Sequence, residues 1–290
     1  PVCSGPRRAE VTCPSRDGHL APATRRWWRL AVPLAIAATV LGGAGCGVDE
    51  PAQTAAPAAT EPLEGAARRD LNIVLITIDT LRTDRISCYG SDRVETPNID
   101  SFAGEGVRFT NAATTVPFTL PAHASILTGL YPPGHGVREN VGYTLDAGVP
   151  TVAEVLSTAG WSTAGFVSAF VLDGRWGVGR GFDHYFDDFD LSGFESANLS
   201  SVQRTGDVTV AEAVRWLDRR PSDRPFFLWL HLYDPHDPYE PPEPFKSAFA
   251  NRPYDGEVAF TDSLIGELRR ALEERHLLES SLVILTSDHG

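Results

Sequence analysis

The sequence has no methionine, four cysteines and a single lysine, Lys246, among its 290 residues. Acidic residues outnumber basic ones by 38 to 25, which gives a net charge of −13. This lack of positive charge argues against non-specific nucleic-acid binding, because Lys and Arg neutralise the phosphate backbone in such complexes. The few cysteines exclude a disulfide-packed miniprotein, and the hydrophobic fraction of 42% excludes wholesale disorder and collagen. We therefore expect a globular chain with a sizeable core.

The apolar run near the N-terminus, residues 30–41, is too short to cross a bilayer comfortably. Arginines precede this run and small residues follow it, which is typical of a secretory signal. Residues 44–46, Ala-Gly-Cys, resemble a bacterial lipobox whose cysteine is lipidated after cleavage, and residues 24–26 resemble a twin-arginine signal more loosely. An ordinary cleaved signal and a single anchor helix are the alternatives. We expect an exported bacterial protein, in the periplasm or anchored as a lipoprotein, that contacts the membrane only through this signal or lipid.

Composition divides the sequence into three parts. Residues 1–46 form an N-terminal extension with the signal and lipobox. Residues 47–70 are rich in Ala, Pro, Thr and Glu, which buries no core and is typical of a flexible tether. Residues 71–290 carry the folded domain, where Cys88 is the only thiol and therefore has no partner for an internal disulfide. Because the sequence lacks Met and stops directly after an apolar run, we expect a piece of a longer protein with an incomplete domain.

Apolar strands alternate with amphipathic helices from residue 71 onward. Residues 71–78 are nearly all apolar and β-branched, which favours a strand buried on both faces, as in a parallel sheet. The alternation predicts an α/β fold, a mainly parallel sheet with helices on both faces, truncated at the C-terminus. The other expected strands cover residues 161–170, 225–233 and 281–286, the helices cover 97–105, 121–127, 151–159, 206–219 and 255–274, and 93–98, 131–150, 173–201 and 239–253 are expected to be loops.

Polar residues that suit metal binding follow three of these strands. They are Asp79 after the first, Asp234 and His236 after the strand at 225–233, and Asp288 and His289 after the last. Ligands of open α/β sheets bind at the carboxyl ends of strands, so we expect these side chains to meet. Asp and His suit Mg²⁺, Ca²⁺, Mn²⁺ or Zn²⁺. A single such Asp is more often a helix cap or a turn residue, but the same chemistry at three strand ends favours a metal site.

A threonine stands just before the helix expected at residues 121–127. Thr119 precedes Pro121, and a Pro in the first turn opens a helix whose N-terminal end is electropositive. The Thr119 hydroxyl is therefore suited to meet an anionic group, with backbone N–H donors nearby. Thr is also a common N-cap residue, and position alone does not separate these two interpretations.

From residue 71 to residue 290 the sequence resembles the sulfatase branch of the alkaline phosphatase superfamily. Any one of the matching motifs is weak, but six of them occur in the family's order, which makes the signal strong. The resemblance implies the α/β fold of that superfamily and metal-dependent cleavage of anionic esters. The matching segments are residues 72–84, residues 88–90 with 96–100, residues 127–129, residues 234–239, residues 254–258 with Asp262, and residues 286–290.

The nucleophile motif departs from the family pattern. Sulfatases resemble Cys/Ser-x-Pro-Ser-Arg at this point, and the first residue becomes formylglycine, whereas residues 119–123 read Thr-Leu-Pro-Ala-His. Thr119 takes the nucleophile position, where conversion to formylglycine is not expected, and His123 takes the position of the Arg. The family's second Asp after the first strand is Thr80, and the Lys of its Lys-x-His-Leu-Gly segment has no match near Ser168. Two cationic contacts to a sulfate are therefore missing or replaced.

The resemblance implies a metal site beside this nucleophile. A divalent ion of Ca²⁺, Mg²⁺, Mn²⁺ or Zn²⁺ is expected to be held by the set Asp79, Thr119, Asp288 and His289. The ion would lower the pKa of the Thr119 hydroxyl, which then attacks the ester in line and forms a covalent intermediate. His236 is expected to contact the leaving group or an anion oxygen and to supply a proton.

Three further residues receive expected roles from the same resemblance. His123 is expected to replace the missing Arg as an anion contact. Thr80 and Asp234 are further candidates for metal ligands. Asp234 and His236 would help to hold a second metal ion if the site is of the two-metal phosphatase type.

The nucleophile also bears on the substrate. A sulfate on a formylglycine hydrate leaves by elimination through the second hydroxyl, whereas a threonine sulfate must wait for water to attack sulfur. A threonine phosphate is routinely cleaved by metal-activated water. We therefore expect a hydrolase of small-molecule or envelope-derived anionic esters, with phosphoryl chemistry favoured. The alternatives are a sulfuric ester hydrolase, a phosphoryl-group transferase of the cell envelope, and a catalytically dead binding protein, against which the retained metal residues argue.

Overall fold

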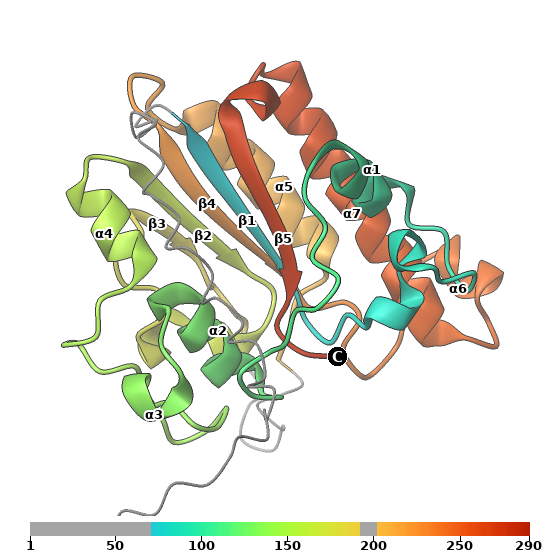
Figure 1. Ribbon diagram of the computed structural model, residues 1–290, viewed down its shortest axis with the longest axis horizontal. Helices are drawn as coiled ribbons and strands as arrows, with labels where there is room; N and C mark the ends of the chain where they lie inside the picture. Colours follow the sequence, from blue (N-terminus) through green and yellow to red (C-terminus); the bar gives the residue numbers. More distant parts are fainter. Residues whose placement is uncertain (1–70, 192–201) are drawn as a thin grey trace, which may run out of the picture. The chain divides into compact units, whose positions relative to one another are not determined.

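A computed structural model describes residues 71–191 and 202–290. These residues form a five-stranded sheet with the order β3-β2-β4-β1-β5, in which every neighbouring pair is parallel (Figure 1). The α/β class and the parallel sheet expected from the sequence are confirmed. The strands are β1 (Asn72–Ile78), β2 (Ser162–Val167), β3 (His184–Phe186), β4 (Phe226–Leu232) and β5 (Ser281–Ser287).

Helices cover both faces of this sheet. In Figure 1, α2, α3 and α4 gather on one side of the strands, and α1, α5, α6 and α7 lie on the other. The helices are α1 (Pro97–Glu105), α2 (Thr119–Thr128), α3 (Pro132–His135), α4 (Val152–Thr158), α5 (Gly206–Arg219), α6 (Phe245–Ala248) and α7 (Pro253–Glu274).

The strongly patterned elements occur where the sequence predicts them, with ends shifted by a few residues. The strand expected at residues 161–170 is shorter, because the chain turns into a 3-10 helix at Phe170–Leu172. Three short elements, α3, α6 and β3, lie in segments that we expected to be loops. Each has three or four residues, which is too few to display a helical or strand periodicity in the sequence.

The central strands pack into a separate core on each face. Val74 and Ile76 of β1 belong to the cluster that packs against α5 and α7. Leu75 of β1 and Trp229 of β4 belong to the cluster that packs against α2 and α4. Because successive strand residues point to opposite faces, both faces must be apolar, which explains the nearly continuous apolar runs of β1 and β4.

The parallel arrangement gathers three strand ends at one edge of the sheet. β1 lies between β4 and β5, so the residues that follow these three strands are neighbours. The pairing continues past the end of β1, where the Asp79 N–H donates to the Leu232 carbonyl at 2.9 Å. α2 begins near this edge with Thr119 as its first residue and Phe118 as its N-cap.

The N-terminal predictions fall on residues that the structure does not describe. The extension, the signal, the lipobox and the tether lie within residues 1–70, outside the described part of the chain. Between residues 71 and 191 and between 202 and 290, no helix is long and apolar enough to span a membrane. Cys88 is a free thiol in the described part.

Candidate active site

Asp79, Asp288 and His289 form one compact group at the ends of β1 and β5. Each offers one potential ligand atom, and these atoms lie within 4.8 Å of one another. His289 Nε2 is 3.5 Å from Asp288 Oδ2 and 3.9 Å from Asp79 Oδ1. Both of these carboxylate oxygens are buried and have no hydrogen-bond partner. Two buried, unpartnered carboxylate oxygens beside an imidazole nitrogen are the donor set of a divalent cation, so the residues present fit the expected metal ion.

The electrostatics of this group also call for a cation. Burial and the negative charge of Asp79 raise the pKa of Asp288 to about 9. Burial acts to raise the pKa of Asp79 too, but the neighbouring His231 ring outweighs it, and the pKa of Asp79 is lowered. Without a cation, Asp288 therefore keeps a proton at neutral pH, and a bound divalent ion would take the place of that proton.

The side chain of Thr119 is hydrogen-bonded to this group. Its hydroxyl donates to Asp79 Oδ2 at 3.0 Å, and the residue is 2% exposed. The hydroxyl does not cap its own helix, since Phe118 is the N-cap and the Leu120 N–H donates to Asn140 Oδ1 at 2.9 Å. A hydroxyl held by a carboxylate of a metal-ligand group has the surroundings of an activated nucleophile.

His123 lies one turn further along α2, with no exposed surface. Its Nδ1 is 2.8 Å from the Thr119 carbonyl, which only accepts, so Nδ1 carries the proton. Its Nε2 therefore accepts from the Thr77 hydroxyl at 3.0 Å, and Trp229 Nε1 donates to the same hydroxyl at 2.9 Å. Burial and the neighbouring His231 lower the pKa of His123 to about 3. The neutral ring thus holds the backbone of Thr119, which differs from the anion contact expected from the sequence, because both nitrogens already have protein partners.

Thr80 connects the three strand ends. Its N–H donates to Asp288 Oδ1 at 3.2 Å, its hydroxyl donates to the Pro235 carbonyl at 2.8 Å, and its carbonyl accepts from the Tyr254 hydroxyl at 2.8 Å. It has a φ of +52°, which is uncommon for a β-branched residue and is held here by these three bonds. Thr80 is not in the metal-ligand group, and its hydroxyl proton is used by a backbone carbonyl.

Asp234 and His236 follow β4 and have different surroundings. Asp234 Oδ1 accepts from the Gly206 N–H at 2.9 Å at the start of α5, and burial raises the pKa of Asp234 to about 6. The metal-ligand group found among the described residues contains neither Asp234 nor His236. The His236 ring stacks on Tyr233, with 4.3 Å between the ring centroids, and its Nδ1–H donates to the Asp237 carbonyl at 2.6 Å. Nε2 is therefore the His236 nitrogen left for proton exchange.

His231 also belongs to this site, and the sequence analysis missed it. It lies inside the apolar strand β4, is fully buried, and places Nε2 3.6 Å from Asp79 Oδ2. Its register partner on β1 is Thr77, two residues before Asp79. The available signal was one imidazole within the apolar run of residues 225–233, close to the strand end where the other site residues gather.

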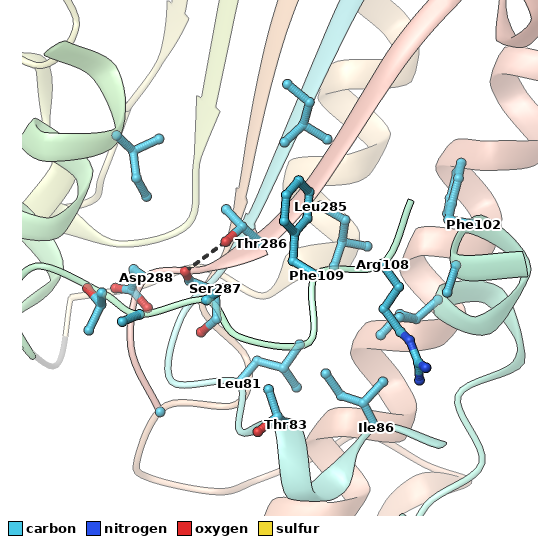
Figure 2. Close-up of a pocket in the computed structure, with 18 of the residues that line it drawn as sticks. Leu81, Thr83, Ile86, Phe102, Arg108, Phe109, Leu285, Thr286, Ser287 and Asp288 are labelled. Carbon is cyan, nitrogen blue, oxygen red and sulfur yellow. Dashed lines mark hydrogen bonds between the residues drawn. The ribbon is translucent and has the colours of Figure 1, made fainter. Parts of the chain in front are cut away.

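A cavity of about 1180 Å³ opens beside this group. Figure 2 shows it running from Asp288 at one end toward Arg108 at the other, between mainly apolar walls. Asp288 and His289 line it, whereas Thr119 and His236 are not among the described residues that do. The cavity therefore reaches the metal-ligand group from the β5 side. Apolar residues of its walls include Leu81, Ile86, Phe102, Phe109 and Leu285.

This chain is similar to proteins of a known family. The family model described as Sulfatase matches residues 71–290. The chain belongs to the sulfatase family. The family resemblance predicted from the six sequence motifs is thereby confirmed.

Several curated sulfatases are similar to this chain. Human arylsulfatase A is 29% identical over 275 residues, which cover 78% of this chain and 53% of the human protein. An N-acetylglucosamine-6-O-sulfatase of Bacteroides thetaiotaomicron is 27% identical over 224 residues, which cover 73% of this chain and 39% of the relative. An arylsulfatase of Clostridium perfringens is 27% identical over 311 residues, with 76% and 63% covered. The chain thus spans about half the length of the curated relatives it matches.

Solved structures show the same fold. The phosphonate monoester hydrolase of Agrobacterium radiobacter matches with a TM-score of 0.64 and 22% identity, covering 76% of this chain and 62% of that structure. A protein solved in complex with its substrate, D-glucosamine-2-N,6-O-disulfate, matches with a TM-score of 0.63 and 21% identity, covering 76% of this chain and 65% of that structure. This chain therefore shares the fold of these solved structures.

Proposed function

We propose that this chain carries the catalytic residues of a metal-dependent hydrolase of phosphate or sulfate esters, with Thr119 as nucleophile. The observation that carries the proposal is the 3.0 Å hydrogen bond from the Thr119 hydroxyl to Asp79, a member of the metal-ligand group. A divalent cation held by Asp79, Asp288 and His289 would supply positive charge and lower the pKa of the Thr119 hydroxyl. Divalent-metal dependence is general in the sulfatase family.

Each of the neighbouring residues has a separate role in the proposed reaction. Asp79 orients the Thr119 hydroxyl, and His123 fixes the first turn of α2 through the Thr119 carbonyl. Thr119 Oγ1 forms a bond to phosphorus or sulfur as the bond to the leaving oxygen breaks, and His236 gives that oxygen a proton. Water then attacks the same phosphorus or sulfur atom and frees Thr119. The Thr119 hydroxyl proton passes to water in the first step, and the attacking water returns a proton to Thr119 Oγ1 in the second step. The proton that His236 gives to the leaving oxygen is replaced from water, so the residues end each cycle as they began it.

The proposed substrate is an anionic ester of a small molecule or an envelope-derived compound, with phosphoryl chemistry favoured. The identity of the nucleophile supports phosphate, since a threonine phosphate is open to attack by activated water. The second candidate is a sulfuric ester hydrolase, which the relatives support because those named above are sulfatases. A structural neighbour is named for phosphonate monoester hydrolysis, so this fold also accommodates chemistry at phosphorus.

We also propose how the parts of the chain serve this activity. Residues 1–46 direct export, residues 47–70 tether the domain, and residues 71–290 form the catalytic part. The site then acts in the periplasm or on a lipid anchor. The basic and apolar pattern at residues 25–41 and the small residues before Cys46 support this arrangement.

The test compares initial rates on nitrophenyl phosphate, bis-nitrophenyl phosphate and nitrophenyl sulfate with Mn²⁺ present. We expect phosphate-ester turnover by the unaltered chain and a loss of at least about 1,000-fold in Thr119→Ala, because the covalent route is removed. Thr119→Ser is the matched control and keeps measurable turnover, because it keeps the hydroxyl. Sulfate turnover that depends on Thr119 would replace the phosphoryl preference with the second candidate. Equal rates in the unaltered chain and Thr119→Ala would contradict the proposed nucleophile.

A further inference from the structure

His231 is an imidazole inside an otherwise apolar strand. None of its surface is exposed, and its ring meets the His123 ring edge to face, with 4.9 Å between the centroids. Its register partners are Thr77 on β1 and Val167 on β2, so it sits in the middle of the sheet. Buried polar groups normally have hydrogen-bond partners, because leaving a buried donor or acceptor without one is unfavourable.

Ser168 determines which nitrogen of His231 carries the proton. The Ser168 N–H donates to His231 Nδ1 at 3.4 Å, so Nδ1 acts as an acceptor and has no proton. The Ser168 hydroxyl donates to the His231 carbonyl at 2.9 Å and pairs with the Thr209 hydroxyl at 2.8 Å. Ser168 therefore holds both the backbone and the ring of His231, and the ring proton lies on Nε2.

The protonated nitrogen lies next to Asp79. Nε2 of His231 is 3.6 Å from Asp79 Oδ2 and has no hydrogen-bond partner. The same Oδ2 accepts the Thr119 hydroxyl, whereas Oδ1 of Asp79 has no partner and lies on the side of His289. The two oxygens of Asp79 thus have separate surroundings, with proton donors at Oδ2 and the metal-ligand group at Oδ1.

We propose that His231 is a positioning residue that acts through Asp79. Its Nε2–H attracts Oδ2 and fixes the rotation of the carboxylate, so that Oδ1 stays available to the metal ion and Oδ2 stays bonded to Thr119. When Thr119 gives up its proton to react, His231 remains as the donor to Oδ2. This inference rests on the proposed function for its catalytic consequence, but the orientation of Asp79 and the affinity for metal are measurable without turnover.

A purely structural role for His231 makes different predictions. If the ring only filled space, an apolar side chain of similar size would serve as well, and metal affinity would follow overall stability. If the Nε2–H donor matters, a side chain that keeps a donor near that point will preserve metal binding. Gln places its amide nitrogen near the position of Nε2, whereas Leu keeps the volume and removes the donor.

The first experiment tests the assigned tautomer in the full chain. Nitrogen NMR of the labelled histidines, with the His231 signal identified by its loss in His231→Gln, reports which ring nitrogen carries the proton. We expect the neutral Nε2–H form. A neutral Nδ1–H form would overturn the proposal, because the ring would then have no donor toward Asp79.

The second experiment measures Mn²⁺ affinity by calorimetry in three variants. Outer-shell partners of metal ligands typically contribute 10–100-fold to affinity, so we expect His231→Leu to weaken Mn²⁺ binding by at least about 10-fold and His231→Gln by less than about 3-fold. The control is His184→Leu on β3, because His184 Nε2 is also buried without a partner, in contact with Phe166. This control should bind Mn²⁺ like the unaltered chain. Equal affinity in His231→Leu and the unaltered chain, or equal weakening in His231→Gln and His231→Leu, would overturn the proposal.

Turnover separates this inference from the proposed function. With an active chain, we expect His231→Leu to lower kcat by more than it changes KM, because Thr119 and not substrate binding depends on Asp79. If the unaltered chain turns over no ester but its Mn²⁺ affinity depends on the His231 donor, the positioning role stands and the proposed function fails. If the chain is active and its Mn²⁺ affinity is the same in His231→Leu as in the unaltered chain, the proposed function stands and the positioning role fails.

Discussion

At the residue scale, the carboxylates of Asp79 and Asp288 place two acidic groups close together in a buried site. Potential ligand atoms of Asp79 and Asp288 lie within 4.8 Å of each other, and unit charges at that separation repel by about 3 kcal/mol at an effective dielectric constant of about 20. Burial, and after it this repulsion, raises the pKa of Asp288 to about 9. The neighbouring His123 is neutral at physiological pH and offers no compensating charge. In the proposed function, a bound cation would supply the compensating positive charge.

The state of His123 gives a prediction at the same scale. Burial lowers the pKa of His123 to about 3, so its ring should stay neutral, with the proton on Nδ1, from about pH 5 to pH 8. Nitrogen NMR of the imidazole signals across that range will check this, with the His123 signal identified by its loss in His123→Gln. A His123 signal that titrates between pH 5 and pH 8 would contradict the neutral positioning role.

At the scale of single elements, α7 connects several parts of the site by buried acidic residues. Asp255 pairs with Arg85 at 3.0 Å, just after β1. Glu257 Oε1 accepts from the Glu240 N–H at 2.6 Å, in the segment after β4. Asp262 accepts the N–H groups of the first turn of α1. Three acidic residues on one helix thus hold the segments that follow β1 and β4, together with α1.

Glu257 makes the stability of this arrangement depend on pH. Burial and the charge of Asp234 raise the pKa of Glu257 to about 8. The folded state then binds a proton more tightly than the unfolded state, so stability is full below about pH 4.5 and falls as the pH rises to about 8. Glu257→Gln has no carboxyl to ionise, so it should not show this loss of stability. Relative to the unaltered chain, its free energy of unfolding should be higher at pH 8 than at pH 5 by about 1–2 kcal/mol, with allowance for solvent near the carboxyl.

Urea unfolding of Glu257→Gln at both pH values measures this difference. The Gln side chain keeps an oxygen that accepts from Glu240, so the hydrogen bond at this point is preserved. The exposed Glu279→Gln serves as the matched control and should follow the unaltered chain. A pH dependence that is identical in Glu257→Gln and the unaltered chain would contradict the raised pKa.

The sequence predicted elements well where many residues repeat one pattern. The buried strand β1 and the long helices α5 and α7 are predicted by their periodicity. The short α3, α6 and β3 depend on tertiary contacts that no local pattern encodes.

The sequence also predicted that Asp79, Asp288 and His289 lie together, because parallel strands end at one edge of a sheet. The contact of His231 with Asp79 was not predicted, because the sequence of an apolar strand does not reveal which of its residues faces a carboxylate. The contacts of His123 depend on Thr77 and Trp229, which come from two other strands.

At the scale of the whole molecule, the site joins distant parts of the chain. The Thr80 N–H bonds to Asp288 Oδ1 across 208 positions of sequence, and the Thr119 hydroxyl bonds to Asp79 across 40. A cation held by Asp79, Asp288 and His289 would join the ends of β1 and β5. Because the unfolded chain has no such arrangement, metal binding should stabilise the folded state by mass action.

Metal removal therefore has a predicted effect on unfolding. Mn²⁺ at about 100 times its Kd should add about 2.7 kcal/mol to the free energy of unfolding. In a domain of this size that gain raises Tm by about 5–10 °C, and EDTA should reverse the rise. Asp288→Asn is the matched control, because the amide oxygen still accepts from Thr80 and His289 but the ligand charge is lost. Calorimetric scans of both proteins with and without Mn²⁺ will check this. A rise of equal size in Asp288→Asn would contradict the assignment of the metal ligands.

The covalent intermediate on Thr119 is the most direct test of the proposed nucleophile. The Mn²⁺-loaded chain is mixed with excess nitrophenyl phosphate, quenched in acid within one turnover, digested and analysed by peptide mass spectrometry. We predict a phosphoryl group on Thr119 in the peptide that contains the start of α2, and no such modification in Thr119→Ala. Product release at the normal rate in Thr119→Ala, or a phosphoryl group on another residue of the site, would contradict Thr119 as the nucleophile.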